Sequence, residues 1–217
     1  MIKAVIFDMD GLMIDSEPIH SRSFEMIIKD YGYEPIFHDN GLVQKVGIKS
    51  KENWEFLKDR HGIREDTDIL VRKKREIYYE ILKEYIKPMP GLLKLVSELK
   101  NQKVKLAVAS SSAIAQIELV LKELGIYEDF DIVVSGEWVE KSKPHPEIYI
   151  LTAKNLGVEP KDCVALEDSI AGVTSAFEAG VKVVAVPTSA TEKEDFSKAN
   201  LRVSSLEDIN WDILTTL

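Results

Sequence analysis

Acidic side chains follow the first apolar run of the chain. Asp8 and Asp10 come directly after the run 2–7, within the stretch FDMDG. Two carboxylates one residue apart could hold a metal ion and take part in chemistry beside it. Asp and Gly after a strand are also common turn residues. This short stretch therefore leaves both interpretations open.

Other polar residues follow later apolar runs in the same way. Three serines (110–112) follow one run, Glu167 and Asp168 follow another, and Lys143 precedes a proline that prevents a helix from continuing. Taken singly, the serines and the two acids could cap the helices that come after them, and Lys143 could be a solvated surface lysine. Their joint occurrence, each just after a predicted strand or before a helix, favours a site.

Short apolar runs alternate with helical patterns along most of the chain. The runs are rich in Val, Ile and Ala and are apolar on successive residues, which is typical of strands covered on both faces: 2–7, 104–109, 131–134, 162–166 and 181–186. Helical patterns lie between them at 92–100, 113–125, 146–157 and 170–180. This alternation predicts an α/β fold with a Rossmann-like parallel sheet. Ligands of such sheets bind beyond the carboxyl ends of the strands, where the polar residues are expected to converge.

One interval departs from this alternation. Between the first and second predicted strands, the sequence has helical patterns at 16–31, 50–61 and 66–86 and no strand-like run. We therefore predict a discontinuous α/β core, 1–14 and 87–217, with a helical domain inserted at 15–86. The basic run RKKR (72–75) lies within a helical pattern beside acidic residues and is interpreted as a solvated face.

Composition and charge narrow the choice of partners and compartment. The chain has 217 residues, is 45% hydrophobic and has a formal net charge of −9, which disfavours nucleic acid and anionic membranes as partners. No apolar run approaches the length of a membrane-spanning helix. The single cysteine, Cys163, excludes an internal disulfide and is expected to be buried in its strand. It favours a reducing compartment, so we expect a cytoplasmic protein, and we also expect a monomer.

The convergence of four carboxylates has an electrostatic consequence. Unpaired and close to a core they would repel one another, at a cost on the order of several kcal/mol, or their pKa values would shift. A divalent cation removes this conflict. Mg²⁺ prefers a few carboxylates together with waters and phosphate oxygens, and Mn²⁺ or Co²⁺ are alternatives. The pattern therefore predicts a divalent metal site with chemistry beside the metal.

Nearly the whole chain resembles the haloacid dehalogenase superfamily. The resemblance is to the branch of phosphatases and β-phosphoglucomutases that carries a helical cap after the first strand. Its motifs occur here in order: FDMDG (7–11), AVASSS (107–112), Lys143 in SKPHPEIY, and ALEDSIAG (165–172).

The resemblance implies a role for each acidic residue. Asp8 would be the nucleophile and form an aspartyl-phosphate, and Asp10 would be the general acid and base. Mg²⁺ would be held by Asp8, the backbone carbonyl of Asp10 and Asp168, with Glu167 either a ligand or next to one.

The resemblance also implies the groups that bind the substrate. Ser110 and the backbone N–H of Ser111 would bind phosphoryl oxygens, and Lys143 would neutralise the remaining charge. The interval 15–86 would close over the site as the cap.

Three residues of this predicted cap are candidates for contact with the substrate. His20 lies at the same spacing from DMDG as a histidine of the phosphoglucomutases, and an ordinary helix histidine is an equal alternative. Lys45 and Lys49 could bind a sugar phosphate, or they could belong to a solvated loop. The remaining histidines show no spacing typical of metal ligands: His38, His61 and His145.

Departures from the mutases favour hydrolysis. The β-phosphoglucomutases carry Lys-Asn shortly after the serines, where this chain has Ala113 and Ile114. They also have an arginine in the cap loop, where this chain offers Lys49 or Lys51. A mutase must hold a bisphosphate at both ends, and these losses weaken that grip. We predict a Mg²⁺-dependent phosphatase of small phosphorylated sugars, with β-phosphoglucomutase, which interconverts β-glucose 1-phosphate and glucose 6-phosphate, as the alternative.

Other classes fit the sequence less well. A dehalogenase needs neither Asp10 nor the acidic pair Glu167 and Asp168. A phosphonate hydrolase would use a cap lysine to form an imine and generally lacks a lysine at the position of Lys143. A receiver-type signalling module would be about half as long and would have no helical insertion. A catalytically silent binding protein remains open, although every motif residue is retained.

Overall fold

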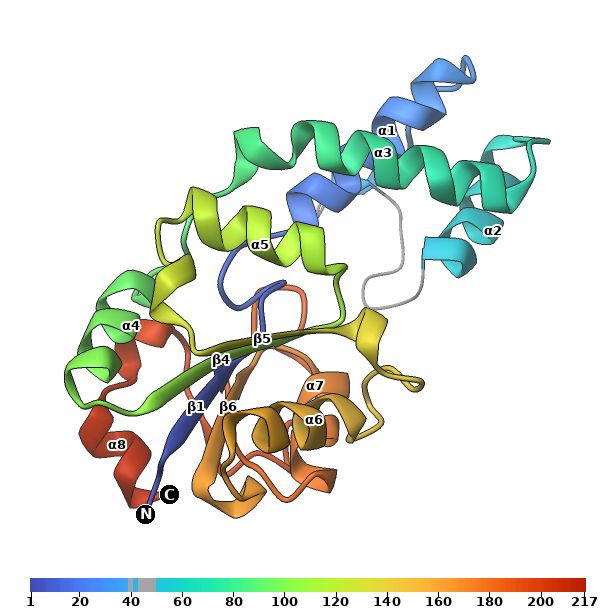
Figure 1. Ribbon diagram of the computed structural model, residues 1–217. Coiled ribbons are helices and arrows are strands. Elements are labelled where there is room, and N and C mark those ends of the chain that lie inside the picture. Colours follow the sequence, from blue (N-terminus) through green and yellow to red (C-terminus); the bar gives the residue numbers. More distant parts are fainter. Residues whose placement is uncertain (39–40, 43–49) are drawn as a thin grey trace. The chain divides into compact units, whose positions relative to one another are not determined.

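The computed structural model describes residues 1–38, 41–42 and 50–217. The chain divides into two compact units (Figure 1). The α/β unit consists of residues 1–15 and 86–217, and the helical unit consists of residues 16–85. Each unit has its own cluster of buried apolar side chains.

A parallel sheet forms the centre of the α/β unit. In the part of the chain that the structure describes, its order is β5-β4-β1-β6-β7-β8. The strands are β1 (Ala4–Phe7), β4 (Lys105–Ser110), β5 (Ile132–Ser135), β6 (Cys163–Glu167), β7 (Lys182–Ala185) and β8 (Leu201–Arg202). Every neighbouring pair is parallel. The predicted α/β fold class is therefore confirmed.

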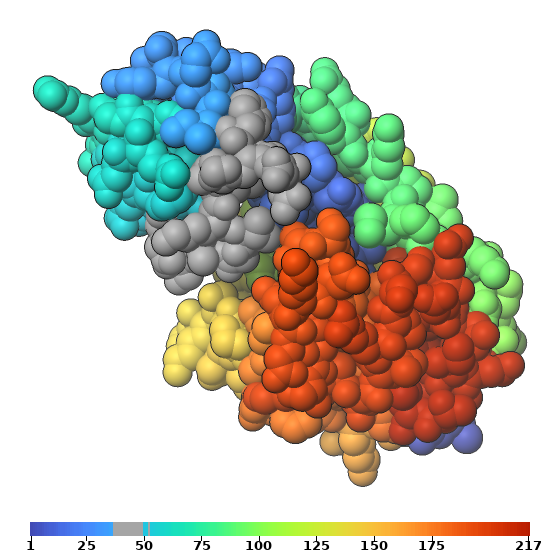
Figure 2. All heavy atoms as spheres, turned by 180° about the vertical axis from the view of Figure 1, so that it is seen from behind, coloured from blue at the N-terminus to red at the C-terminus, as the bar shows by residue number. Residues whose placement is uncertain are grey.

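Helices cover both faces of this sheet. On one face α6 (Glu147–Leu156) packs beside α7 (Ile170–Glu178), and on the other lie α4 (Leu92–Asn101) and α5 (Ile114–Glu123) (Figure 1). All residues of β1 and β6 are buried, as expected of strands that apolar helices cover on both sides. Cys163, the first residue of β6, is buried as predicted. In the view of Figure 2, the segments after β6 are visible next to one another, in orange to red.

The end of the α/β unit contains elements that the sequence analysis did not predict. They are the two-residue strand β8 and a short helix, α8 (Trp211–Thr216). Asn210 caps α8 by accepting a hydrogen bond from the backbone N–H of Ile213 (2.9 Å). A backbone bond from Trp211 to the carboxylate of Glu98 (2.8 Å) attaches the start of α8 to α4.

The helical unit is built from α1 (Glu17–Asp30), α2 (Ser50–His61) and α3 (Thr67–Tyr85). Its core is formed by apolar residues at helical spacing, which the sequence pattern predicted in part: Phe24, Ile27, Ile28, Trp54, Leu57, Ile63 and Leu70. Ser16 stands at the N-cap of α1, but its side chain makes no capping hydrogen bond with the described residues.

Two details of this unit differ from expectation. A small antiparallel pair, β2 (Phe37–His38) and β3 (Gly41–Leu42), lies in the interval where no strand was predicted. The basic run 72–75 is not uniformly solvated, because Lys74 is buried while Arg72, Lys73 and Arg75 are exposed. The predicted helix was correct, but its buried face includes one lysine.

The two stretches that lead out of and back into the α/β unit lie side by side. Ile14 and Pro88 form an antiparallel bridge, and the backbone N–H of Met89 donates to the carbonyl of Met13 (2.9 Å). The chain therefore leaves the α/β unit after β1 and returns to this unit at nearly the same place.

Candidate active site

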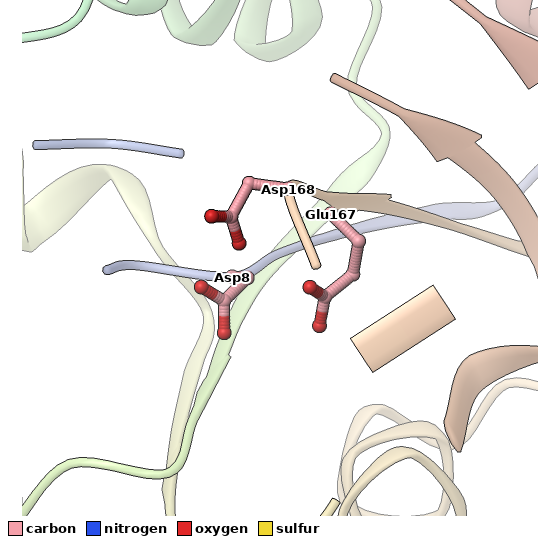
Figure 3. A group of neighbouring side chains, drawn as sticks. All are labelled: Asp8, Glu167 and Asp168. Atoms are coloured by element: carbon pink, nitrogen blue, oxygen red, sulfur yellow. The ribbon is translucent and has the colours of Figure 1, made fainter. Parts of the chain in front are cut away.

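The ends of neighbouring strands bring the predicted residues of the α/β unit together. Asp8 follows the last residue of β1, and its backbone N–H donates to the carbonyl of Leu166 in β6 (3.0 Å). Glu167 is the last residue of β6, and Asp168 comes next. Ligand oxygens of these three acids all lie within 4.8 Å of one another (Figure 3). Parallel pairing at matched register causes this convergence, as predicted.

Lys143 provides a positive charge inside this group of acids. Its Nζ lies 2.6 Å from Asp8 Oδ1 and 2.6 Å from Glu167 Oε1, and it also donates to the carbonyl of Ala109 (2.9 Å). The side chain of Lys143 is only 7% exposed, so the alternative of a solvated surface lysine is wrong. Lys143 instead connects β1, β4 and β6 through one ammonium group.

Negative charge nevertheless exceeds positive charge here. Burial raises the pKa of Asp8 to about 8, although Lys143 opposes this rise. Burial and the charge of Asp8 raise the pKa of Asp168 to about 9. Burial works against the ammonium form of Lys143, but Asp8 and Glu167 raise its pKa above the usual value. Without a further cation, Asp8 and Asp168 tend to keep their protons.

These features fit a hard divalent cation. Carboxylate oxygens are the ligands that such ions prefer, and a cation would favour the ionised forms that burial disfavours. Asp8 and Asp168 are the best placed ligands. Glu167 Oε1 already accepts hydrogen bonds from Lys143 and Tyr149, so Glu167 would reach a cation only through Oε2.

Two glycines leave room for these carboxylates. Gly11, with φ of +85°, lies so close to Asp168 that an added Cβ would stand 2.0 Å from its Oδ2. At Gly172, in the first turn of α7, an added Cβ would lie 1.9 Å from Glu167 Oε2. Ser169 caps α7 by accepting from the N–H of Gly172 (3.1 Å), so the alternative that Glu167 or Asp168 is the cap is wrong.

The serine loop after β4 is held by its own hydrogen bonds and not by a capping role. Ser112 Oγ donates to Asp10 Oδ2 (2.6 Å), and the backbone N–H of Ser112 donates to Ser110 Oγ (3.1 Å). Ser135, at the end of β5, donates to the carbonyl of Ser112 (2.7 Å). The N-cap of α5 is Ala113, so the alternative that a serine caps this helix is wrong.

The loop therefore fixes Ser110 beside Asp8 at adjacent strand ends. Ser111, between the two anchored serines, is exposed. An added Cβ at Gly136 would lie 2.8 Å from the carbonyl oxygen of Ser111, which shows how closely the β5 end supports this loop.

Several residues of this group were not singled out from the sequence. Tyr149 donates to Glu167 Oε1 (2.5 Å), and Thr191 Oγ1 donates to the backbone carbonyl of Asp168 (2.8 Å). Tyr149 lies in a helical pattern, where a tyrosine is typical of ordinary core. Thr191 lies in a loop 23 residues after Asp168. No spacing signal links either of them to the acids.

The candidate residues of the helical unit are described only in part. Lys45 and Lys49 lie outside the described residues. His20 Nδ1 lies 2.7 Å from Lys74 Nζ, and its ring stacks on Tyr78 with a centroid distance of 4.6 Å. Burial and the charge of Lys74 lower the pKa of His20 to about 3, so the imidazole is neutral at pH 7. A neutral ring next to an ammonium accepts a hydrogen bond from it.

Comparison with known proteins places this arrangement in a family. A family model of haloacid dehalogenase-like hydrolases matches residues 5–186. The phosphorylated carbohydrates phosphatase of Thermotoga maritima is 31% identical over 182 residues, 83% of this chain and 83% of that protein. The β-phosphoglucomutase of Bacillus subtilis is 30% identical over 223 residues, 98% of this chain and 94% of that protein.

A solved structure is similar over nearly the full length. The structure of CbbY from Rhodobacter sphaeroides in complex with phosphate has a TM-score of 0.81 at 27% identity and covers 96% of each chain. The recognition made from the four motifs is confirmed. The chain belongs to the haloacid dehalogenase-like hydrolase family.

Proposed function

We propose that this protein is a Mg²⁺-dependent phosphatase that hydrolyses small phosphorylated carbohydrates through an aspartyl-phosphate intermediate. The relatives confirm the coarser enzyme class predicted from the sequence, a phosphoric monoester hydrolase. One observation carries the finer proposal. A buried carboxylate, Asp8, stands at a strand end against the ammonium of Lys143 and close to Asp168.

The first chemical step would transfer the phosphoryl group to the protein. An oxygen of Asp8 attacks phosphorus as the bond to the sugar oxygen breaks, and Asp10 donates a proton to that leaving oxygen. Lys143 and Ser110 bind phosphoryl oxygens and stabilise the charge that gathers on them. When bound, Mg²⁺ would reduce the repulsion between the carboxylate of Asp8 and the phosphate.

The second step would return Asp8 to its starting state. Asp10, now ionised, takes a proton from a water molecule whose oxygen attacks phosphorus. The bond between phosphorus and Asp8 breaks, and inorganic phosphate leaves. The hydrogen bond from Ser112 to Asp10 (2.6 Å) supports this role, because it keeps one carboxylate oxygen in a fixed place before substrate arrives.

The helical unit is proposed as the cap that selects substrate. It is inserted between β1 and α4, and the paired stretches around Ile14 and Pro88 would serve as its hinge. The low pKa of His20 does not favour a role as a proton donor at pH 7. We therefore propose for His20 a contact between its neutral ring and the substrate. Substrate roles for Lys45 and Lys49 stay predictions.

The alternative of a β-phosphoglucomutase is supported by one of the relatives by name. Two features count against it. Ala113 and Ile114, at the start of α5, offer no polar group for a second phosphate, and Lys51 is engaged at the surface with Asp68 (2.8 Å). Hydrolysis is therefore the function we favour.

Location and assembly are less directly supported. Among the residues that the structure describes, no helix is long and apolar enough to cross a bilayer. A cytoplasmic location, a monomeric state and the absence of nucleic-acid partners stay predictions from composition.

The experiment measures phosphate release with Mg²⁺ from a panel of hexose and pentose phosphates, beside conversion of β-glucose 1-phosphate to glucose 6-phosphate. We expect release without isomerisation, and a loss of at least about 10³-fold in Asp8→Asn because the nucleophile is gone. Asp212→Asn, the same change at an exposed position of α8, is the matched control and should retain full activity. Isomerisation faster than release would establish the mutase instead.

A further inference from the structure

Tyr149 contacts two residues of the candidate site, Glu167 and Lys143. It is a residue of α6, its side chain is fully buried, and its hydroxyl donates to Glu167 Oε1 (2.5 Å). The ammonium of Lys143 lies 5.1 Å from the centre of its ring and 3.5 Å from its hydroxyl. Tyr149 therefore contacts both partners of an ion pair that is itself buried.

Glu167 is the residue on which these contacts converge. It is fully buried, and its Oε1 accepts both from Tyr149 (2.5 Å) and from Lys143 (2.6 Å). Its other oxygen has only a long contact with Ser169 Oγ (3.4 Å) among the bonds of the described residues. Two strong donors on one oxygen fix the rotation of the carboxylate, and the hydroxyl of Tyr149 is one of them.

Lys143 links this carboxylate to the nucleophile. Its Nζ is shared between Glu167 Oε1 and Asp8 Oδ1, each at 2.6 Å. If the hydroxyl of Tyr149 were removed, the buried Oε1 of Glu167 would lose one of its two strong donors, and the ammonium of Lys143 would be the one that remains. The ammonium would then move toward Glu167 and away from Asp8.

We infer that Tyr149 is a positioning residue that holds Glu167, and through Glu167 the ammonium of Lys143, in place against Asp8. This inference rests on the proposed function, because it assigns the hydroxyl a part in phosphoryl transfer. Tyr149 acts through another side chain, so the expected loss lies in turnover and in binding of the cation beside Glu167 and not in binding of the sugar.

The test removes one oxygen atom. Tyr149→Phe keeps the ring and deletes the hydroxyl. Its matched control is Thr152→Val, one turn along the same helix, which deletes a fully buried hydroxyl that donates to the carbonyl of Ile148 (2.7 Å). In Tyr149→Phe we expect kcat to fall about tenfold, KM to stay within about twofold and Mg²⁺ affinity to fall about tenfold. Thr152→Val should leave all three within about twofold.

A double-mutant cycle separates positioning from general packing. If Tyr149 acts through Glu167, Tyr149→Phe should have less than about a twofold effect when Glu167→Gln is already present. Additive losses in kcat and in Mg²⁺ affinity, or a Tyr149→Phe enzyme within about twofold of the original protein, would overturn the inference. Two quantities are measured for every variant of the cycle. One is phosphate release, and the other is the shift of Tm caused by Mg²⁺ alone.

The measurement of Tm with Mg²⁺ distinguishes a failure of the proposed function from a failure of the inference about Tyr149. If the unaltered protein releases no phosphate from any substrate, the proposed function fails, while coupling between Tyr149 and Glu167 in the Mg²⁺-dependent Tm still tests the inference. If Tyr149→Phe does not fold, a crystal structure of the unaltered protein with Mg²⁺ decides. Tyr149 and Lys143 must both remain within hydrogen-bond distance of Glu167, and a Glu167 turned away from Tyr149 would overturn the inference.

Discussion

The two units of this protein each bury a lysine side chain, and the described contacts of the two lysines differ. In the α/β unit Lys143 lies 2.6 Å from two carboxylates at the ends of β1 and β6. In the helical unit the ammonium of Lys74 lies 5.3 Å from the ring centre of Phe24 and 5.0 Å from that of Tyr78. The first lysine belongs to a charged network of described residues, and the described contacts of the second include two aromatic rings and the imidazole of His20.

This difference follows from the architecture of each unit. Parallel strands end at one edge of the sheet, so side chains distant in sequence meet there with their charges facing one another. Helices that pack through apolar stripes bring rings together instead, and a buried lysine there is stabilised by contact with aromatic faces. Chemistry is therefore expected to depend on single charges in the α/β unit and much less so in the helical unit.

The largest expected effect compares the two lysines directly. Lys143→Met should lower phosphate release by about 10²–10³-fold, because it removes the cation that neutralises phosphoryl oxygens beside Asp8. Lys74→Met makes the same change in the helical unit and should cost less than about tenfold. Both are measured as kcat with a saturating sugar phosphate. Equal losses would show that the buried charge of the helical unit is as close to the chemistry as that of the sheet.

A smaller effect is expected from a single added methyl group. Gly172 is in a helix, where alanine is normally the better residue by about 1 kcal/mol. Here its Cβ would meet a carboxylate that Lys143 and Tyr149 hold in place. We expect Gly172→Ala to destabilise the protein by about 1–3 kcal/mol and to lower phosphate release about tenfold.

The matched change in the helical unit is Gly62→Ala. Gly62 has φ of +72°, and the nearest atom to an added Cβ is Tyr33 Oη at 3.7 Å. Strain of the backbone should cost about 1 kcal/mol, with phosphate release within about twofold. Urea unfolding and the same phosphate assay measure both variants. A fully active and stable Gly172→Ala protein would mean that Glu167 need not stand where it does.

The last expected effect concerns how the stability of the metal-free protein depends on pH. Asp8 and Asp168 have pKa values of about 8 and about 9 in the folded state, above their usual values, so the native state binds more protons than the unfolded state as pH rises from about 4 to 9. The contribution of Asp8 and Asp168 to the free energy of unfolding therefore falls as pH rises over this range. His20, with its pKa lowered to about 3, has the opposite sign, and its contribution rises up to about pH 6.5.

Calorimetry in EDTA separates these contributions. Above pH 6.5 the raised pKa values of Asp8 and Asp168 still lower stability as pH rises, so we expect Tm to be lower at pH 8 than at pH 6.5, by roughly several degrees. Saturating Mg²⁺ should remove this fall. The difference in stability between the original protein and His20→Phe should increase in favour of the original from pH 4 to 6.5. A Tm that is flat or rising from pH 6.5 to 8 in EDTA would contradict the charge excess inferred for the site.

Much of the α/β unit could be predicted because its signals are local. Apolar runs predicted the main strands, and the four motifs predicted which residues would meet at the strand ends. The short elements β8 and α8 were missed because they have too few residues for a periodic pattern. In the helical unit the same reasoning found the helices but placed Lys74 on a solvated face. A helical pattern shows which residues share one side of a helix. It does not show whether the ammonium of a lysine lies in water or beside aromatic rings.

The amino-acid sequence by itself determined the family, the α/β sheet and the set of acids, serines and lysine that would share one edge. These depend on residue types next to strands, which the sequence states directly. Only the tertiary structure decided that Lys143 joins Asp8 to Glu167, that Tyr149 holds Glu167 and that Gly172 leaves room for it. Those contacts join side chains from different elements, and their geometry depends on how β1, β6, α6 and α7 pack together.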